Sequence, residues 1–363
     1  MKDFDIKDLA KLVEEEYDEF LKKMGIVNIL IAGKSGVGKS TLINAIFQGD
    51  FATTGQGSPI TKETRKLTKK GIPVSLFDTQ GLELEQYQET LNHLIGFIDD
   101  SRRKSDENDH IHAAWVCVSE DSARWEAGEI ALVKLLSENK IPVIVVITKA
   151  RQDKGLLSEI RKLSPEASQY VRIRALAEIL DDGHQLKPMG LIELIQVTHE
   201  IVPEGKKSAF SAAQKVDLDL KKNNANKVIA TACTAAGAAG ASPIPFSDAA
   251  IIAPIQASMI VGVTVSMGLT YDQSALTSIA TAAVGCTTAT LLGRTIAVNL
   301  LKLIPGGGTL VGGAISATTA IALTGALGKL YLELLIKLIE RHGREPSVDE
   351  ILEGFKDAWA NRN

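Results

Sequence analysis

Apolar and polar positions alternate in two different patterns along residues 25–200. Short apolar runs, bounded by charged or turn-forming residues, alternate with longer segments whose apolar residues recur every three or four positions. The short runs predict buried strands over Val27–Ala32, Val74–Asp78, Ala113–Val118 and Pro142–Thr148, a weaker strand over Val171–Ala175 and an edge strand over Arg65–Lys70. The longer segments predict helices near Lys39–Phe47, Leu84–Asp100, Glu126–Ser137, Lys154–Leu163 and Leu191–Ile201. Such alternation predicts a mostly parallel sheet with helices on both faces.

The two ends of the chain follow other patterns. Asp3–Met24 has the spacing of an amphipathic helix, which we expect to dock on the domain that follows. Pro203–Lys207 indicates a linker or turn, after which the strand pattern stops and only helices are predicted. We therefore expect an N-terminal helix over 1–24, an α/β domain over 25–205 and an all-α domain over 206–363.

Charged residues are scarce in part of the helical region. Of the 40 basic and 44 acidic residues, only four lie within 228–328: Asp248, Asp272, Arg294 and Lys302. Several uncharged segments are long enough to cross a bilayer, which takes about 20 residues, and the strongest candidates are 303–328 and 249–271. Ala, Gly, Thr and Ser dominate these segments, however, so a soluble bundle with a core of small residues also fits. Membrane association and a soluble bundle both stay open.

Net charge and cysteine content exclude some classes of protein. A formal net charge of −4 disfavours a nucleic-acid binder, so no nucleic-acid partner is expected. The three cysteines are far apart, which argues against a disulfide framework and a zinc site. The first twenty residues are densely charged and lack the apolar core of a signal peptide, so we expect a cytoplasmic location.

A complete phosphate-binding loop follows the first predicted strand. It consists of Gly33, Lys34, Ser35, Gly36, Val37, Gly38, Lys39 and Ser40, with Thr41 directly after it in the predicted helix. The glycines let backbone N–H groups turn toward a phosphate, and the helix N-terminus adds a favourable dipole. Lys39 is expected to bridge the β- and γ-phosphates, and the Ser40 hydroxyl is expected to coordinate Mg²⁺.

A second motif, Asp78-Thr79-Gln80-Gly81, stands at the end of another predicted strand. Asp78 is expected to hold Mg²⁺ through water, and the amide of Gly81 is expected to contact a γ-phosphate. The polar segment 55–61, predicted as a loop, ends in Thr61, which would bind Mg²⁺ only when a γ-phosphate is present. Thr64 competes for this role. The pattern therefore predicts a switch that responds to the γ-phosphate.

These motifs, with Thr148-Lys149 at the end of a later strand, resemble the Era-like branch of the Ras-related GTPases over about residues 25–200. The resemblance implies a Ras-like P-loop fold that binds GTP or GDP with Mg²⁺ and hydrolyses GTP slowly. It implies that Lys149 packs over the guanine, and that residues near Arg174-Ala175-Leu176 contact the base. A second copy of the chain and an activating protein are further candidate partners.

Two positions depart from the family pattern. The aspartate that reads guanine in the family is replaced by Arg151, whose guanidinium has only donors; Asp153 is a candidate substitute. ATP therefore remains an alternative ligand. The glutamine that orients water in Ras-like enzymes is replaced by Leu82. Lys39, Thr61 and Gln80 remain the candidate catalytic residues, and a scaffold with negligible turnover is the alternative function.

The C-terminal region resembles a second family. Residues 214–217 (Gln-Lys-Val-Asp) and 243–248 (Pro-Ile-Pro-Phe-Ser-Asp) are similar to a bacterial domain of unknown function that follows GTPase domains and occurs in YcjF-like membrane proteins. This resemblance implies a hydrophobic helical domain near a membrane, with lipid as a candidate partner. Near the C-terminus, Ser347 and Glu350 have the spacing of a helix capping box.

Overall fold

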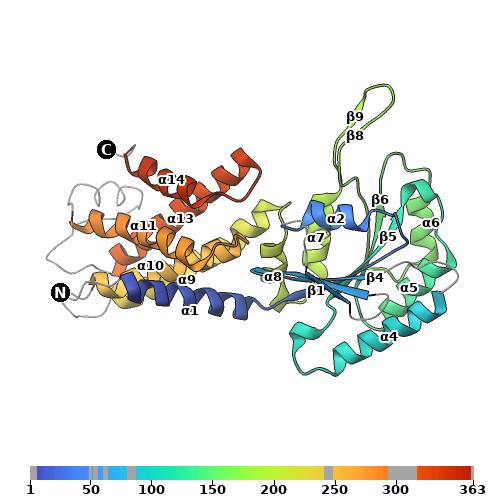
Figure 1. Cartoon of the computed structure of the whole chain (residues 1–363), viewed down its shortest axis with the longest axis horizontal. Helices are drawn as coiled ribbons and strands as arrows, with labels where there is room; N and C mark the ends of the chain where they lie inside the picture. Colours follow the sequence, from blue (N-terminus) through green and yellow to red (C-terminus); the bar gives the residue numbers. More distant parts are fainter. Residues whose placement is uncertain are drawn as a thin grey trace. The chain divides into compact units, whose positions relative to one another are not determined.

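The computed structural model describes residues 6–48, 51, 56–59, 64–79, 87–240, 248–292 and 317–360. The chain divides into two compact units. One, called here the α/β unit, is Met24–Asp217, and the other, the helical unit, combines Met1–Lys23 with Leu218–Asn363. Figure 1 shows the sheet and its helices in the first unit and helices alone in the second. The predicted fold class, a mostly parallel α/β domain with an all-helical region, is confirmed.

A seven-stranded sheet forms the centre of the α/β unit, in the order β2-β3-β4-β1-β5-β6-β7. Five strands run parallel: β4 (Ile72–Thr79), β1 (Val27–Ala32), β5 (Ala113–Ser119), β6 (Val143–Thr148) and β7 (Gln169–Arg172). β1, β5 and β6 are buried along their whole length, as their apolar runs predicted. Because the five are parallel, the loops after their carboxyl ends all leave the same edge of the sheet.

The antiparallel side of the sheet corrects two expectations. Arg65–Lys70 was predicted as an edge strand, but β3 (Thr64–Lys69) lies between β4 and β2 (Gln56–Pro59). The residues of β2 belong to the segment predicted as a loop. Their Gln-Gly-Ser-Pro sequence carries no strand signal, but an edge strand pairs on one side only and needs no apolar run.

Helices cover both faces of the sheet (Figure 1). They are α2 (Lys39–Ile46), α4 (Tyr87–Arg103), α5 (Ala127–Glu138), α6 (Leu156–Leu163), α7 (Leu191–Ile201) and α8 (Glu204–Ala213). Apolar residues of α4, α5 and α6 share one core with alternate residues of the strands, Val116 and Val145 among them. Residues of α2, α7 and α8 form the other layer around Trp115, whose indole N–H donates to Thr198 Oγ1. The neighbouring β5 side chains Trp115 and Val116 thus point to opposite faces of the sheet.

Helix α8 begins within the segment that was predicted as a linker. Pro203 is the N-cap residue, with φ −54° and ψ 146°, and Glu204 begins the helix. Phe210 of α8 meets Phe47 edge-on, with ring centroids 6.5 Å apart, and Phe47 stacks on Trp115 at 5.8 Å. α8 is therefore part of the α/β unit, and the linker prediction for 203–207 was wrong.

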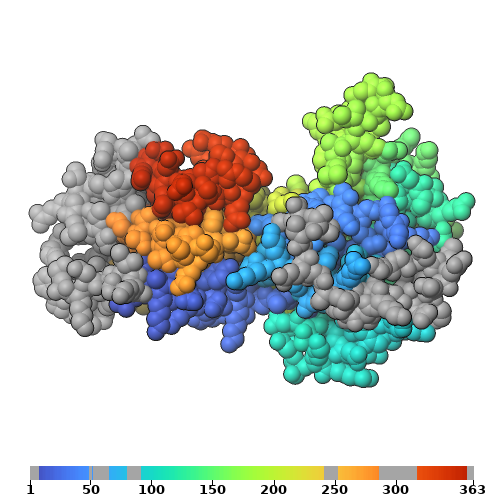
Figure 2. All heavy atoms as spheres, in the orientation of Figure 1, coloured from blue at the N-terminus to red at the C-terminus, as the bar shows by residue number. Residues whose placement is uncertain are grey.

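A two-stranded hairpin follows β7. It consists of β8 (Glu178–Ile179) and β9 (Gln185–Leu186), and it projects from the surface of the α/β unit in Figures 1 and 2. The Asp182 carboxylate accepts from the His184 N–H at 2.9 Å, and Leu180 N–H donates to the His184 carbonyl at 2.9 Å. These bonds give the turn a defined conformation and so fix where Glu178 begins the hairpin.

A buried histidine connects β1 to the segment before β5. The N–H of Asn28 donates to His112 Nδ1 at 2.9 Å, and His112 Nε2 lies 3.0 Å from the Glu107 carbonyl oxygen. Since Nδ1 accepts, the ring is neutral and Nε2 carries the proton. Burial, helped by the positive charge of Lys206, lowers the pKa of His112 to about 4.

We expect this histidine to make the α/β unit sensitive to acid. Its folded pKa lies below its unfolded value of about 6.5, so the unfolded state binds protons first and stability falls between pH 6.5 and 4, by about 3 kcal/mol in full. Urea unfolding followed by tryptophan fluorescence at pH 7 and pH 5 measures the loss. His112→Gln should reduce the pH dependence, whereas His184→Gln, at an exposed position, should leave it unchanged. An equal pH dependence in all three proteins contradicts this assignment.

The helical unit packs long helices around α9. They are α1 (Ile6–Met24), α9 (Leu218–Gly240), α10 (Asp248–Ser266), α11 (Gln273–Leu292), α13 (Ala317–His342) and α14 (Val348–Ala360). α10 and α13 both pack on α9. Gly328 of α13 lies so close to α9 that a Cβ there would come within 2.8 Å of Ile229 Cγ1. Small residues therefore set the helix spacing in this core.

The N-terminal helix packs within the helical unit. Ser258 of α10 donates to Glu16 at 2.6 Å, and Gln273 of α11 donates to Glu14 at 2.7 Å. Phe20 lies against α10 at Gly262, where a Cβ would come within 2.5 Å of the ring. We expected this helix to dock on the domain that follows it in sequence. The structure groups it with helices far along the chain, which amphipathicity alone does not identify.

Two sequence predictions about the C-terminal helices can be compared with the structure. The capping box is confirmed: Ser347 N–H donates to Glu350 at 2.7 Å, and Glu350 N–H donates back to Ser347 Oγ at 3.3 Å. Most of the predicted span 303–328 lies outside the described residues. Among the described helices, α13 is long and apolar enough to cross a membrane, and half of its most apolar stretch is buried inside the unit. A core helix of a soluble protein has the same properties.

Candidate functional site

The phosphate-binding loop connects the carboxyl end of β1 to α2. Gly33 begins it with φ +150°, and a Cβ there would lie 2.3 Å from the Cys117 carbonyl oxygen. Gly38 precedes α2 in a left-handed conformation with φ +98°. Lys39 curls over the loop, where its Nζ donates to the carbonyls of Gly33 at 2.8 Å and Lys34 at 3.2 Å. The loop and the lysine therefore surround the N-terminus of α2, and a helix N-terminus is the kind of place where proteins bind phosphate.

Lys34 holds the loop to the start of α5. Its ammonium lies 2.7 Å from a Glu126 carboxylate oxygen and 3.5 Å from one of Glu129. Glu129 in turn accepts from the backbone N–H of Glu126 at 3.1 Å. The Lys34 side chain is thus occupied by these ion pairs, and any contact of Lys34 with a phosphate is expected from its backbone N–H alone.

Asp78, near the end of β4, has the properties of a magnesium ligand. Its Oδ1 atom is buried and has no hydrogen-bond partner within the described part of the chain. Burial raises the pKa of Asp78, and the positive charges of Lys39 and Arg65 oppose that rise. A cation would favour the ionised form and satisfy the unpaired oxygen. The residues therefore fit Mg²⁺, which usually takes one or two protein oxygens together with water and phosphate oxygens.

The described residues contain no cluster of three or more His, Cys, Asp or Glu side chains that could hold a metal by themselves. A site of the Mg²⁺–nucleotide kind needs no such cluster, because phosphate oxygens supply part of the coordination. Ser40, in the first turn of α2, supplies the second candidate oxygen.

Thr148 ties the end of β6 to the phosphate-binding loop. Its hydroxyl donates to the carbonyl of Val37 at 2.5 Å, with the carbonyl of Val118 at 3.0 Å. Lys149 follows with φ +53°, an uncommon conformation for a residue with a side chain, and is exposed. The Thr148–Lys149 turn is therefore directly connected to the loop, although the two lie far apart in sequence.

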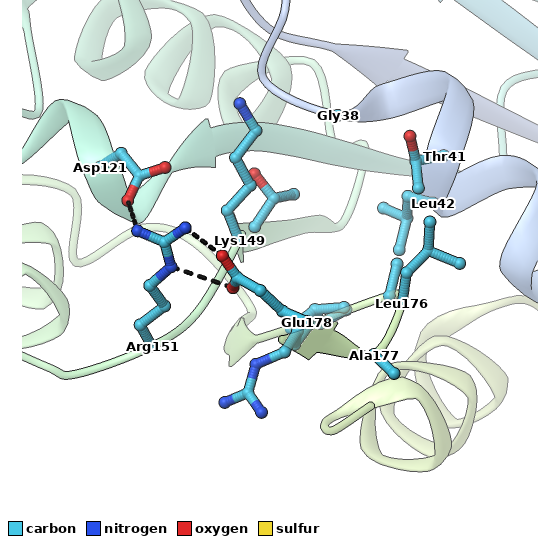
Figure 3. Close-up of a pocket in the computed structure, with 13 residues that line it drawn as sticks. Gly38, Thr41, Leu42, Asp121, Lys149, Arg151, Leu176, Ala177 and Glu178 are labelled. Atoms are coloured by element: carbon cyan, nitrogen blue, oxygen red, sulfur yellow. Dashed lines mark hydrogen bonds and ion pairs between the residues drawn. The ribbon is translucent and has the colours of Figure 1, made fainter. Parts of the chain in front are cut away.

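A cavity of about 230 Å³ opens beside this turn (Figure 3). Its walls come from the start of α2, the end of β6 and the segment after β7, and they are Gly38, Thr41, Leu42, Asp121, Thr148, Lys149, Arg151 and residues 173–178. One end lies next to the phosphate-binding loop at Gly38, and the other is lined by charged side chains. The cavity has the position of a nucleoside pocket that continues from a phosphate site.

Arg151 occupies the charged end of the cavity. Its Nε donates to a Glu178 carboxylate oxygen at 2.9 Å, and its Nη2 contacts the other oxygen, so the pair is bidentate. Its Nη1 lies 3.8 Å from Asp121 Oδ1. In Figure 3 these two carboxylates approach the guanidinium from different elements. The N–H of Arg151 donates to Glu120 at 2.5 Å, which fixes the backbone as well.

Comparison with known proteins agrees with the GTPase resemblance of this part of the chain. Residues 28–149 match the family described as 50S ribosome-binding GTPase. The chain is 28% identical to GTPase Era of Aquifex aeolicus over 208 residues, and 26% identical to GTPase Era of Xanthomonas campestris pv. campestris (strain B100) over 182 residues. Residues 28–149 belong to a P-loop GTPase domain.

These matches cover only part of each protein. The Aquifex match covers 54% of this chain and 64% of its relative, and the Xanthomonas match covers 49% and 56%. The chain thus spans a little over half the length of these relatives. A solved structure of Toc33 from Arabidopsis thaliana in complex with GDP and Mg²⁺ is 18% identical and covers 56% of this chain and 96% of its own, with a TM-score of 0.32. The family assignment applies to residues 28–149 of the α/β unit, and the resemblance of the helical region stays a prediction.

Several predicted site residues of the GTPase domain are described and several are not. The structure brings together the loop residues 33–41, Thr148 and Lys149 at one edge of the sheet, and Asp78 lies one residue before the end of the neighbouring strand β4. Thr61, Gln80 and Gly81 lie outside the described residues, as does Leu82. The competing Thr64 begins β3. Their roles therefore remain predictions.

Two residues near the base pocket of the GTPase domain are engaged elsewhere. Arg174, in the predicted base-contact segment, donates to the carbonyls of Ala150 at 2.8 Å and Lys187 at 2.7 Å. Asp153, the candidate substitute for the missing aspartate, accepts from the Gly155 N–H at 2.9 Å and does not line the cavity. Arg174, Ala175 and Leu176 all line the cavity, and their contact with a base stays a prediction.

The sequence interpretation of the GTPase domain missed Glu178 and Asp121. Neither lies in a recognisable motif, and Glu178 reaches Arg151 only because β8 turns back beside the pocket. A usable signal was present in the Asp181-Asp182-Gly183 turn, since Asp-Gly between short strands is typical of a hairpin.

Proposed function

We propose that the α/β unit binds GTP and GDP with Mg²⁺ and hydrolyses GTP slowly, as a switch. One observation carries the proposal. The phosphate-binding loop, the unpaired Asp78 oxygen and the Thr148–Lys149 cavity follow the carboxyl ends of parallel strands in one sheet. In open α/β sheets this edge is where ligands bind.

Each residue has a definite task in this proposal. The loop amides bind the β-phosphate, while Lys39 exchanges its two carbonyl acceptors for oxygens of the β- and γ-phosphates. Ser40 and Asp78 would hold Mg²⁺, with Thr61 joining them in the GTP state. Mg²⁺ supplies neutralisation of phosphate charge when bound. Gly81 would contact the γ-phosphate, so loss of that phosphate would release both the segment of Thr61 and the segment of Gly81.

Slow hydrolysis follows from the position after Gly81. Leu82 has no polar group with which to orient water, and Gln80 stands on the other side of the glycine. Turnover would therefore depend on Gln80, on an activating protein or on a second copy of the chain. The alternative is a nucleotide-binding scaffold with negligible turnover. Leu82 favours this alternative too, because it cannot orient a water molecule for hydrolysis.

Hydrogen bonds inside the α/β unit support a route by which the nucleotide state would reach the helical unit. Residues 213–217, which lead directly into α9, hydrogen-bond to the end of α2. Lys215 N–H donates to the Ile46 carbonyl at 2.8 Å, Lys215 Nζ donates to the Asn44 carbonyl at 2.7 Å, and Gln48 N–H donates to the Ala213 carbonyl at 3.3 Å. A displacement of α2 would therefore move the start of the connection to α9.

We further propose that the helical unit associates with a membrane while the GTPase domain stays in the cytoplasm. The support is the near absence of charge from residues 228–328 and the apolar length of α13. Flotation with vesicles of phosphatidylethanolamine and phosphatidylglycerol, in GDP and in a non-hydrolysable GTP analogue, tests this. Different vesicle-bound fractions in the two states are expected. Equal, fully soluble partitioning contradicts the membrane proposal without touching nucleotide binding.

Single-turnover hydrolysis tests the enzymatic proposal. Full-length protein loaded with GTP should release phosphate slowly when Mg²⁺ is present, and chelation should stop the release. Asp78→Asn should slow it by about tenfold or more, since the neutral amide is a poorer metal ligand. Asp109→Asn, in the same unit but away from the loop, is the control. Bound GTP that stays intact over hours in the wild type would instead support the scaffold.

A further inference from the structure

The pocket of the GTPase domain has an arginine where the related enzymes have the carboxylate that reads the base. Guanine presents two donors on this edge, N1–H and the exocyclic amine, so its recognition needs an acceptor. A guanidinium has donors only and cannot supply one. Arg151 therefore cannot replace the missing aspartate by itself, and a carboxylate must come from another element.

Two carboxylates line the described cavity, those of Glu178 and Asp121. Glu178 makes the bidentate contact with Arg151, whereas Asp121 has a single approach of 3.8 Å. The Glu178 side chain is 31% exposed and that of Asp121 is 52% exposed. Glu178 is therefore the better fixed and the more enclosed of the two, which favours it as the group that selects a ligand.

The pairing leaves Glu178 able to accept from a base. An ionised carboxylate has about four acceptor positions, and Arg151 takes two of them. Hydrogen bonding from Arg151 also lowers the pKa of Glu178, so the carboxylate stays ionised at neutral pH. The backbone on either side is fixed as well, because Glu178 pairs with Leu186 in the hairpin and Arg151 N–H is held by Glu120.

We infer that Glu178 is the base-reading residue of this protein and that Arg151 is the residue that positions it. The ligand class is a guanine nucleotide, with N1–H and the exocyclic amine donating to the Glu178 carboxylate. The inference rests on the proposed nucleotide binding and adds the source of its base selectivity. The hairpin β8–β9 thus supplies the acceptor that the Thr148–Lys149 segment lacks.

Exchange of the acceptor for a donor gives the sharpest test. Xanthine carries a carbonyl where guanine has the exocyclic amine, so Glu178→Gln should weaken GDP binding at least about tenfold and strengthen XDP binding. Fluorescent-GDP displacement by GDP, XDP and ADP measures all three affinities on the full chain. Glu138→Gln makes the same chemical change on the exposed surface of α5, outside the cavity, and should leave the order of affinities unchanged.

The role of Arg151 is tested through a double-mutant cycle. Arg151→Ala should weaken GDP binding without improving XDP binding, because the Glu178 carboxylate, although misplaced, can still only accept hydrogen bonds and cannot donate one to the xanthine carbonyl. In the Glu178→Gln background the same change should have little further effect on GDP. Arg151→Lys should recover part of the loss. A full additional loss in the double variant would overturn the positioning role.

Other outcomes separate this inference from the proposed function. A switch toward XDP in Asp121→Asn but not in Glu178→Gln would assign the reading to Asp121 and overturn the inference. Preference for ADP over GDP in the wild type would also overturn it, while leaving phosphate binding intact. If the wild type binds none of the three nucleotides, the proposed function itself fails.

Discussion

Lys39→Ala is expected to reduce the affinity of the protein for GTP by about 100-fold or more. The Lys39 ammonium already lies over the loop, 2.8 Å from the carbonyl oxygen of Gly33, and needs only to exchange carbonyl acceptors for phosphate oxygens. A charge-assisted hydrogen bond contributes about 1.5–3 kcal/mol, and two of them correspond to at least the stated loss. Titration with fluorescent GTP in the presence of Mg²⁺ measures it.

The matched control for this variant is Lys134→Ala. Lys134 is exposed on α5, where it forms a surface ion pair with Glu138 at 3.9 Å. Its removal lowers the net charge equally but should leave GTP affinity within about twofold, since exposed ion pairs contribute little. If Lys39→Ala binds GTP as tightly as Lys134→Ala, the phosphate site has been assigned to the wrong residues.

The second large effect is expected from Gly33→Ala. The Cβ of alanine would lie 2.3 Å from the Cys117 carbonyl oxygen, and that oxygen belongs to the backbone of the central strand β5. Neither side can yield without moving the loop away from the sheet. We expect destabilisation on the order of 3 kcal/mol, a fall of about 10 °C in Tm, and loss of GTP binding. Differential scanning fluorimetry and GTP titration report the two effects.

Gly36→Ala separates the steric clash from the general cost of replacing a loop glycine. Gly36 also has a positive φ, +76°, but a Cβ there meets nothing within 4 Å. The expected cost is therefore about 1 kcal/mol, from conformation alone. Equal losses of stability in the two variants would mean that the close approach of Gly33 to Cys117 does not constrain the loop.

The central strands were predictable because burial on both faces requires continuous apolar residues. β1 matches its predicted bounds, and β5 and β6 differ from theirs by one residue. The phosphate-binding loop was equally clear, since its glycines are demanded by close backbone approaches such as that of Gly33 to Cys117. Buried strands and loop glycines, which are required by burial and by backbone geometry, can thus be predicted from a single sequence.

Features that depend on contacts between distant segments were not predictable. The polar sequence of β2 is sufficient for an edge strand but indistinguishable from a loop. The amphipathic pattern of α1 indicates that one face is buried, yet not that Glu16 and Ser258 meet. Glu178 reaches Arg151 through a hairpin whose strands have two residues each, which is too short for a periodicity signal. The sequence therefore predicted the Thr148–Lys149 side of the cavity but not the contribution of Glu178.

The most direct test of the whole account is a calorimetric comparison of GDP and ADP binding to the full-length protein with Mg²⁺. A complete phosphate site together with a carboxylate base reader predicts that GDP binds about 100-fold more tightly than ADP, because adenine offers an acceptor where guanine offers N1–H. Equal affinities, or tighter binding of ADP, would contradict a guanine-specific GTPase domain in this chain.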